Sequence, residues 1–140
     1  MQLAKVYVEI SGRRVKSVTA RKDPSVICFT CPECSRNAQF KDQKRSILDY
    51  KCSSGHVIQV DVSGEYAEII SVQIPHIPLK TCPKCGRTKL EKVHNQLYPE
   101  QDGVYRFVIY RCPVGHETKE RQLELREFNV PPKELWEGWQ

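Results

Sequence analysis

The sequence predicts an all-β fold of two small modules, each stabilised by a bound metal ion. Three observations lead to this prediction: a Cys/His pattern that occurs twice, apolar residues that alternate with polar ones, and a modest apolar content. The chain has 140 residues, of which 39% are hydrophobic. A small module with so thin a core usually needs a disulfide, a metal or a partner for stability.

The repeated pattern has the form Thr-Cys-Pro-x-Cys, a spacer, and then Tyr-[Lys/Arg]-Cys-x-x-Gly-His. The first copy runs from Thr30 to His56 and the second from Thr81 to His116. In Cys-Pro-x-Cys the proline fixes φ, so the turn can point both sulfurs at one centre and its backbone N–H groups at the sulfurs. The glycine before each histidine permits a positive φ that aims the imidazole inward.

Three thiolates and one imidazole complete a tetrahedron and leave no position for water or substrate, which is typical of structural zinc. The sequence therefore predicts two structural Zn²⁺ ions per chain. The expected ligands are Cys31, Cys34, Cys52 and His56 for one ion, and Cys82, Cys85, Cys112 and His116 for the other.

Iron and disulfides are the alternatives to zinc. Iron–sulfur clusters are usually held by thiolates alone, which disfavours iron here. Disulfides need an oxidising compartment, but the N-terminal residues alternate in polarity and lack the apolar core of a signal peptide. No stretch approaches the ~20 apolar residues of a membrane span. We expect an intracellular protein, cytoplasmic or associated with the nucleus or nucleoid, that does not bind membranes.

Three further Cys and His residues fall outside the predicted ligand sets. Cys28 has ligand-like spacing to Cys31, but it aligns with Leu79 in the second copy. We therefore expect Cys28 to be a small buried apolar group. His76 and His94 have no counterpart in the repeat and are expected to be ordinary surface or loop histidines.

The N-terminal part of the chain shows strand signals. Residues 5–10 alternate in polarity, Ser11-Gly12 supplies a turn, and Val15 and Val18 suggest a return strand.

A second hairpin follows the first Cys/His copy. Residues 58–62 alternate in polarity, Ser63-Gly64 turns the chain, and residues 67–74 return. Basic residues follow the turn of the first hairpin, and acidic residues follow the turn of the second. This complementary charge fits two hairpins that pack in one sheet, and coincidence is the alternative for so short a match.

The second Cys/His copy is flanked by two more predicted strands, Val104 to Arg111 and Lys119 to Phe128. The predicted organisation is N-terminal β-hairpins with the first metal module (1–74), a stiff proline-rich linker (75–79), the second module (80–128) and a tail (129–140).

The ligand motifs resemble those of zinc ribbons, in which two turns at the tips of hairpins hold a small antiparallel sheet. The resemblance covers about residues 27–60 and 78–125. It implies a role in transcription, replication or translation, through binding of nucleic acid or another protein.

The N-terminal segment is also similar to the zinc module of minichromosome-maintenance helicases. The residues that carry this similarity are Val8-Glu-Ile-Ser-Gly12 and Phe29-Thr-Cys31-Pro-Glu-Cys34. In those helicases the ribbon projects from an OB-fold that contacts DNA. The similarity implies an OB-like barrel around the first module.

Nucleic acid, DNA or RNA, is the first expected partner. The formal net charge is +5, and two zinc ions with six thiolates leave about +3. Phosphates need cations, and aromatic residues such as Phe40, Tyr98 and Tyr105 could stack on bases. The candidate phosphate-binding residues are Arg13, Arg14, Lys16, Arg21, Lys22, Lys41, Lys44 and Arg45. The alternative for these cations is a solubilising role alone.

A protein-interaction adaptor in a larger nucleoprotein assembly is the second hypothesis. The acidic tail with Trp136 and Trp139 supports it. Catalysis is the third and least favoured hypothesis, because both metals are expected to be closed. The sequence also shows no Gly-rich phosphate loop, Ser–His–Asp set or carboxylate pair. We expect neither an enzyme nor a small-molecule substrate.

Overall fold

The fold is nearly all β, as the sequence predicts. The computed structural model describes residues 5–128, so the predicted protein-binding tail lies outside the described residues. In chain order the strands and the helix are β1 (Val6–Tyr7), β2 (Glu9–Ile10), β3 (Arg13–Arg14), α1 (Ser17–Lys22), β4 (Phe29–Thr30), β5 (Asn37–Lys44), β6 (Ile47–Cys52), β7 (Val57–Asp61), β8 (Glu68–Gln73), β9 (Glu91–Glu100), β10 (Gly103–Arg111) and β11 (Glu117–Glu127).

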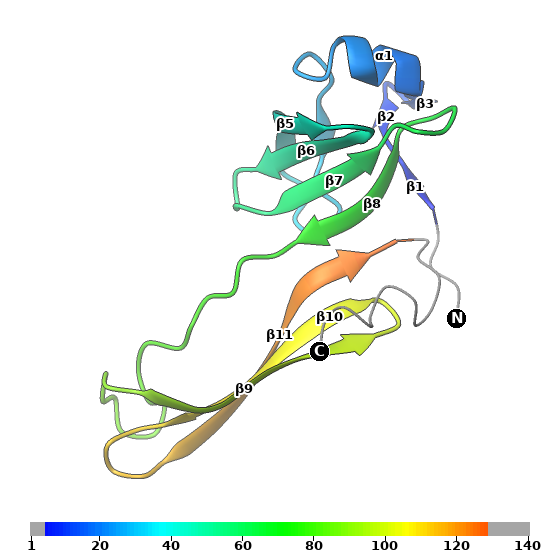
Figure 1. The fold of residues 1–140 in the computed structure, drawn as a ribbon. Helices are drawn as coiled ribbons and strands as arrows, with labels where there is room; N and C mark the ends of the chain where they lie inside the picture. Colours follow the sequence, from blue (N-terminus) through cyan, green and yellow to red (C-terminus); the bar gives the residue numbers. More distant parts are fainter. Residues whose placement is uncertain (1–4, 129–140) are drawn as a thin grey trace.

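One continuous antiparallel sheet contains both metal modules. Its strand order is β4-β5-β6-β7-β8-β11-β10-β9, with β1 added beside β8. We call β5–β7 the first ribbon and β9–β11 the second ribbon. Figure 1 shows α1 next to the first ribbon and the second ribbon extending away on the other side of β8. The OB-like barrel stays a prediction, since the described strand pairs follow an open path from β4 to β9.

The core of the first ribbon follows the two-residue period of its strands. Leu48 and Tyr50 of β6 and Ile58 and Val60 of β7 alternate with more exposed neighbours and are buried. The Phe29 ring packs edge-on against Tyr50 at 4.8 Å between centroids. The expected packing of both hairpins in one sheet is met in part. Val6 of β1 pairs with Ile69 of β8, whereas β2 and β3 pair with each other in a separate two-stranded sheet.

The predicted return strand through Val18 is wrong. Pairing with β2 ends at Arg14, and α1 begins at Ser17. Ser17 and Ala20 are buried while Val18 is 53% exposed, a three-residue spacing that suits a helix. The small side chains of Ser17 and Ala20 let this turn of helix lie close to the sheet.

Strands β5, β6 and β9 are not among the predicted strands, and β9 has no pattern that would indicate it. Most of its residues are exposed on both faces, so no alternation marks it. It is an edge strand, and Pro99 is tolerated there because an edge residue can do without a ladder N–H.

The segment between β8 and Cys82 lies along the second ribbon. Ile77 N–H donates to the Gln122 side chain, whose amide donates back to the Ile77 carbonyl. His76 contacts Glu120 at 3.2 Å, and Leu79 N–H donates to the Tyr110 hydroxyl. The proposed division of the chain at residues 75–79 stays a prediction.

Candidate metal centres and the surrounding surface

The structure brings each predicted ligand set together. Within the first cluster, Cys31 Sγ lies 3.5 Å from His56 Nδ1 and Cys34 Sγ lies 3.6 Å from Cys52 Sγ. The corresponding distances in the second cluster are 3.8 Å from Cys82 Sγ to His116 Nδ1 and 3.7 Å from Cys85 Sγ to Cys112 Sγ. In each cluster all ligand atoms lie within 4.8 Å of one another.

These distances match the edges of a zinc tetrahedron. Zn–S bonds of about 2.3 Å place two sulfurs about 3.8 Å apart, and a Zn–N bond of about 2.1 Å gives a sulfur–nitrogen edge of about 3.6 Å. A disulfide would bring sulfurs to about 2.0 Å, so the cysteines are not oxidised pairs. The chain therefore contains two separate Cys₃His metal sites whose geometry and donor chemistry fit structural Zn²⁺.

The turns that carry the first two ligands of each site, which we call the first and second knuckles, have the same hydrogen bonds. In the first knuckle, Cys31 N–H donates to the Arg36 carbonyl and Ser35 N–H donates to the Cys31 carbonyl. In the second, Cys82 N–H donates to Arg87 and Gly86 N–H donates to Cys82. The repeated pattern shows that Cys-Pro-x-Cys builds one local structure in both sites.

The turns that carry the last two ligands are equally matched. Gly55 N–H donates to the Cys52 carbonyl, and Gly115 N–H donates to Cys112. Gly55 has φ 88° and Gly115 has φ 106°, which confirms the predicted need for glycine before each histidine. His116 N–H also donates to Cys112 Sγ at 3.3 Å, the expected support for a thiolate.

Backbone N–H groups help to lower the pKa of one thiol in each cluster. The backbone N–H of Arg36 is the largest cause of a Cys34 pKa lowered to about 6. Burial acts to raise the pKa of Cys112, but N–H groups of His116, Val114 and Gly115 and the neighbouring Cys85 thiol lower it to about 6. Burial raises the pKa of Cys31 to about 11, so binding a cation there displaces a proton.

The remaining Cys and His residues do not join the sites. Cys28 is exposed, so the prediction of a buried group is wrong. Ile27 and Phe29 are buried on either side of Cys28, which lies just before β4 and is exposed. His76 lies in a loop as expected, although it is half-buried against Glu120, whereas His94 is exposed on β9.

Seven of the eight predicted nucleic-acid residues lie in two adjoining places, and the eighth, Lys41, lies elsewhere. Arg13, Arg14, Lys16, Arg21 and Lys22 lie on β3, α1 and the residues between them, and Lys44 and Arg45 lie at the β5–β6 turn. These places adjoin, because Arg21 donates to the Val62 carbonyl and Val62 N–H donates to Ser46. The Arg14 guanidinium packs on the Tyr7 ring, with its central carbon 4.2 Å from the ring centroid.

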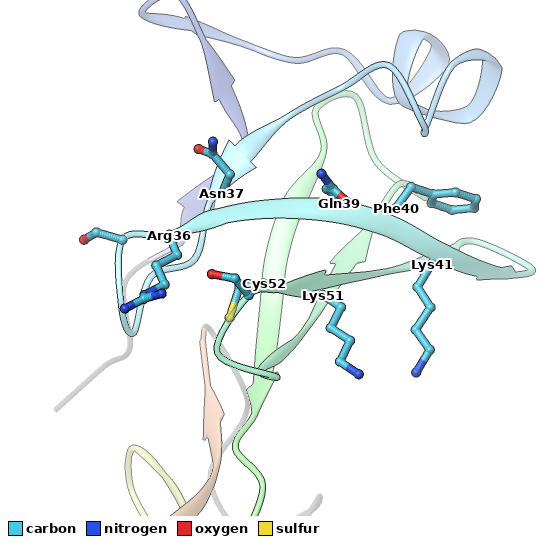
Figure 2. A pocket seen from close by; sticks show the side chains of 9 residues that line it. Arg36, Asn37, Gln39, Phe40, Lys41, Lys51 and Cys52 are labelled. Carbon is cyan, nitrogen blue, oxygen red and sulfur yellow. The ribbon is translucent and has the colours of Figure 1, made fainter.

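Lys41 belongs to a different surface, a hollow of roughly 800 Å³ beside the first metal site. Figure 2 shows Arg36, Lys41 and Lys51 around this hollow, with Lys41 and Lys51 extending to the same side of β5 and β6. Asn37, Gln39 and Phe40 also line it. We call this surface the basic hollow. Arg36 and Lys51 were not predicted, although each has a basic counterpart in the repeat, Arg87 and Arg111.

The arginines on the strands of the second ribbon are paired with carboxylates. Arg106 bonds Glu124, Arg111 lies 2.7 Å from Glu117, Arg121 lies 3.6 Å from Glu100, and Arg126 bonds Glu33 and Asp102. Within residues 5–128, no ion pair joins Arg36, Lys41 or Lys51 to a carboxylate. The cations of the basic hollow are therefore not neutralised by a carboxylate of the described chain and are free to bind an anionic ligand.

Comparisons with protein-family models, curated proteins and solved structures find no match for this chain. Across residues 5–128, no helix has the length and apolar character needed to cross a membrane.

Proposed function

We propose that the protein is a non-catalytic zinc-ribbon protein that binds nucleic acid through the basic hollow. The single observation that carries the proposal is the set of cations without carboxylate partners, Arg36, Lys41 and Lys51, on one concave surface. Phosphate oxygens are the ligands that such cations favour. Amide side chains of Asn37 and Gln39 beside them can donate to phosphate, sugar or base edges.

The metal supports this surface without taking part in chemistry. Cys52 is both a metal ligand and part of the lining of the hollow. Arg36 accepts the hydrogen bond from Cys31 N–H with its carbonyl. Zinc would therefore fix the backbone from which Arg36 and Lys51 project. Because the protein supplies four ligands, we also propose that neither metal is catalytic.

Salt-dependent binding tests the proposal. In the zinc-loaded protein, Lys41→Gln/Lys51→Gln should weaken binding to a mixed-sequence oligonucleotide by an order of magnitude or more. It should also reduce the slope of log K against log salt by about two, because two phosphate contacts are lost. Fluorescence anisotropy across a salt series measures both quantities.

The matched control is Lys5→Gln/Arg111→Gln, which removes the same charge from residues that face Glu68 and Glu117. This control should bind like the unmodified protein. Equal losses in the two double variants would show a general charge effect and contradict a site at the basic hollow.

A further inference from the structure

The second ribbon has one covered face and one open face. On β10, Val104, Val108 and Tyr110 are buried, and the segment 75–80 lies on their side through Tyr110 and Glu120. Tyr105, Phe107 and Ile109 alternate with them and are only half-buried. Hydrogen bonds of segment 75–80 go to Tyr110 and Glu120 on the other side of the sheet, whereas the ring contacts of Tyr105 and Phe107 come from the neighbouring strands β9 and β11.

Cross-strand neighbours extend this open face over all three strands. Residues paired directly across a sheet share a face. The partners of Tyr105, Phe107 and Ile109 are Tyr98, Gln96 and His94 on β9 and Leu123, Arg121 and Lys119 on β11. We call these nine residues the outer face.

Aromatic rings dominate the outer face and contact one another. Tyr98 and Tyr105 stack with centroids 6.1 Å apart, and His94 meets the Phe107 ring at 5.7 Å. The Arg121 guanidinium lies 4.0 Å from the Tyr105 centroid. Rings held in place by such contacts lose little freedom when a planar ligand stacks on them.

The charge of this surface favours an anionic partner. Lys119 is exposed on the outer face, and no ion pair holds it within the described chain. The second knuckle, at the zinc end of the same ribbon, adds exposed Lys84, Arg87 and Lys89. Two acids beside the aromatic residues are both paired with arginines. Glu100 is paired with Arg121, and Asp102, which accepts a hydrogen bond from the Tyr105 hydroxyl, is paired with Arg126.

We infer that the outer face is a stacking platform for the bases of single-stranded nucleic acid, with Lys119 and the second knuckle contacting the phosphates. The inference rests on the nucleic-acid binding proposed above but not on the basic hollow, and it narrows the ligand to unpaired strands. Every base has a π face, so aromatic rows bind unpaired bases with little sequence preference. In a duplex the bases are stacked on each other and cannot reach a flat sheet.

The test compares single-strand with duplex affinity in the two-zinc protein. The probes are a labelled oligothymidylate of about 20 nucleotides and a mixed duplex of similar length, since single-strand sites span about 4–16 nucleotides. Phe107→Leu keeps apolar surface but removes the ring that a base would stack on. It should weaken oligothymidylate binding about tenfold and leave duplex binding unchanged.

Leu97→Ala is the matched control, because Leu97 pairs with Arg106 and so faces the opposite side of the ribbon. It should change neither affinity. Unchanged oligothymidylate binding in Phe107→Leu, or an equal loss for both probes, would overturn the inference. A dimer in sedimentation that Phe107→Leu dissociates, with single-strand affinity unchanged, would assign the face to a second copy of the chain.

The lysine pair of the basic hollow separates this inference from the proposed function. If Lys41→Gln/Lys51→Gln has no effect while Phe107→Leu loses single-strand affinity, the basic hollow fails and the stacking platform stands. The reverse result overturns the platform alone. A protein that binds neither probe overturns both.

Discussion

Ser35 and Gly86 occupy the same position in the two knuckles, one residue after the second cysteine. Both have a positive φ, 62° for Ser35 and 74° for Gly86. An L-residue pays a steric cost in this region that glycine avoids. The first knuckle is therefore under backbone strain that the second is spared.

We predict that Ser35→Gly raises the free energy of unfolding by about 0.5 kcal/mol, because relief of strain exceeds the added entropy of the unfolded chain. Gly86→Ser should lower it by a similar amount. Urea unfolding at a fixed zinc concentration measures both. A loss of stability in Ser35→Gly would show that the serine side chain has a stabilising contact.

Gly103 is required where β9 turns into β10. Its φ is 154°, and a Cβ at this position would lie 1.9 Å from the Leu125 carbonyl oxygen. Backbone atoms on β11 cannot move aside without breaking the pairing of the two strands. The irregular register between Val104 and Tyr105 is next to this close approach.

Gly103→Ala should therefore lower the free energy of unfolding by about 3 kcal/mol. Gly64→Ala is the control, because a Cβ at Gly64 meets nothing within 4 Å. The control should stay within about 0.5 kcal/mol of the unmodified protein. Similar melting temperatures for the two variants would contradict the close approach.

The ligand residues could be predicted because their chemistry is local. Cys-Pro-x-Cys and Cys-x-x-Gly-His each form one turn, and the second copy repeated the first. The burial of Cys28 was wrongly predicted because its alignment with Leu79 compared only residue types. Its exposure follows from the alternation of buried and exposed residues along this segment. Ile27 and Phe29 on either side of Cys28 carried that signal.

Among the elements, strands in which polar and apolar residues alternate were the easiest to predict. Strand β7 and the C-terminal part of β11 show this alternation, whereas β9 is exposed over most of its length. Strand β6 was not predicted although one of its faces is buried. The short helix α1 was not predicted because six residues, fewer than two turns, are too few to show a helical period. The tyrosine of each repeat was read only as part of the motif, yet Tyr50 and Tyr110 are central core residues of the two ribbons.

The junction between the ribbons depends on few contacts. Strands β8 and β11 pair over Leu125–Gln73, Arg126–Val72 and Glu127–Ser71. Arg126 also bonds Glu33, the variable residue of the first knuckle, and Asp102 at 3.3 Å. One side chain thus ties the first metal site to the second ribbon.

Arg126→Gln should lower the free energy of unfolding by about 1 kcal/mol, since these partly exposed charges are screened by solvent. Arg111→Gln is the control, because Arg111 and Glu117 are both nearly half exposed. It should cost less than about 0.5 kcal/mol. Thermal unfolding with zinc bound compares them, and a larger loss in Arg111→Gln would contradict the role given to Arg126.

At the scale of the whole molecule, two zinc sites are joined by one sheet. The sequence indicated two equivalent modules because the repeat is explicit. It did not indicate that β8 and β11 pair, because that contact depends on main-chain edges rather than on side-chain patterns. The sequence also did not indicate which basic residues are paired with carboxylates, because ion pairs between β10 and β11 depend on strand register.

Zinc content measured by native mass spectrometry tests the ligand assignment of both sites. The unmodified chain should bind two zinc ions, Cys52→Ser and Cys112→Ser one each, and Cys28→Ser two. Two ions retained in Cys52→Ser, or one lost in Cys28→Ser, would contradict the ligand assignment on which both sites rest.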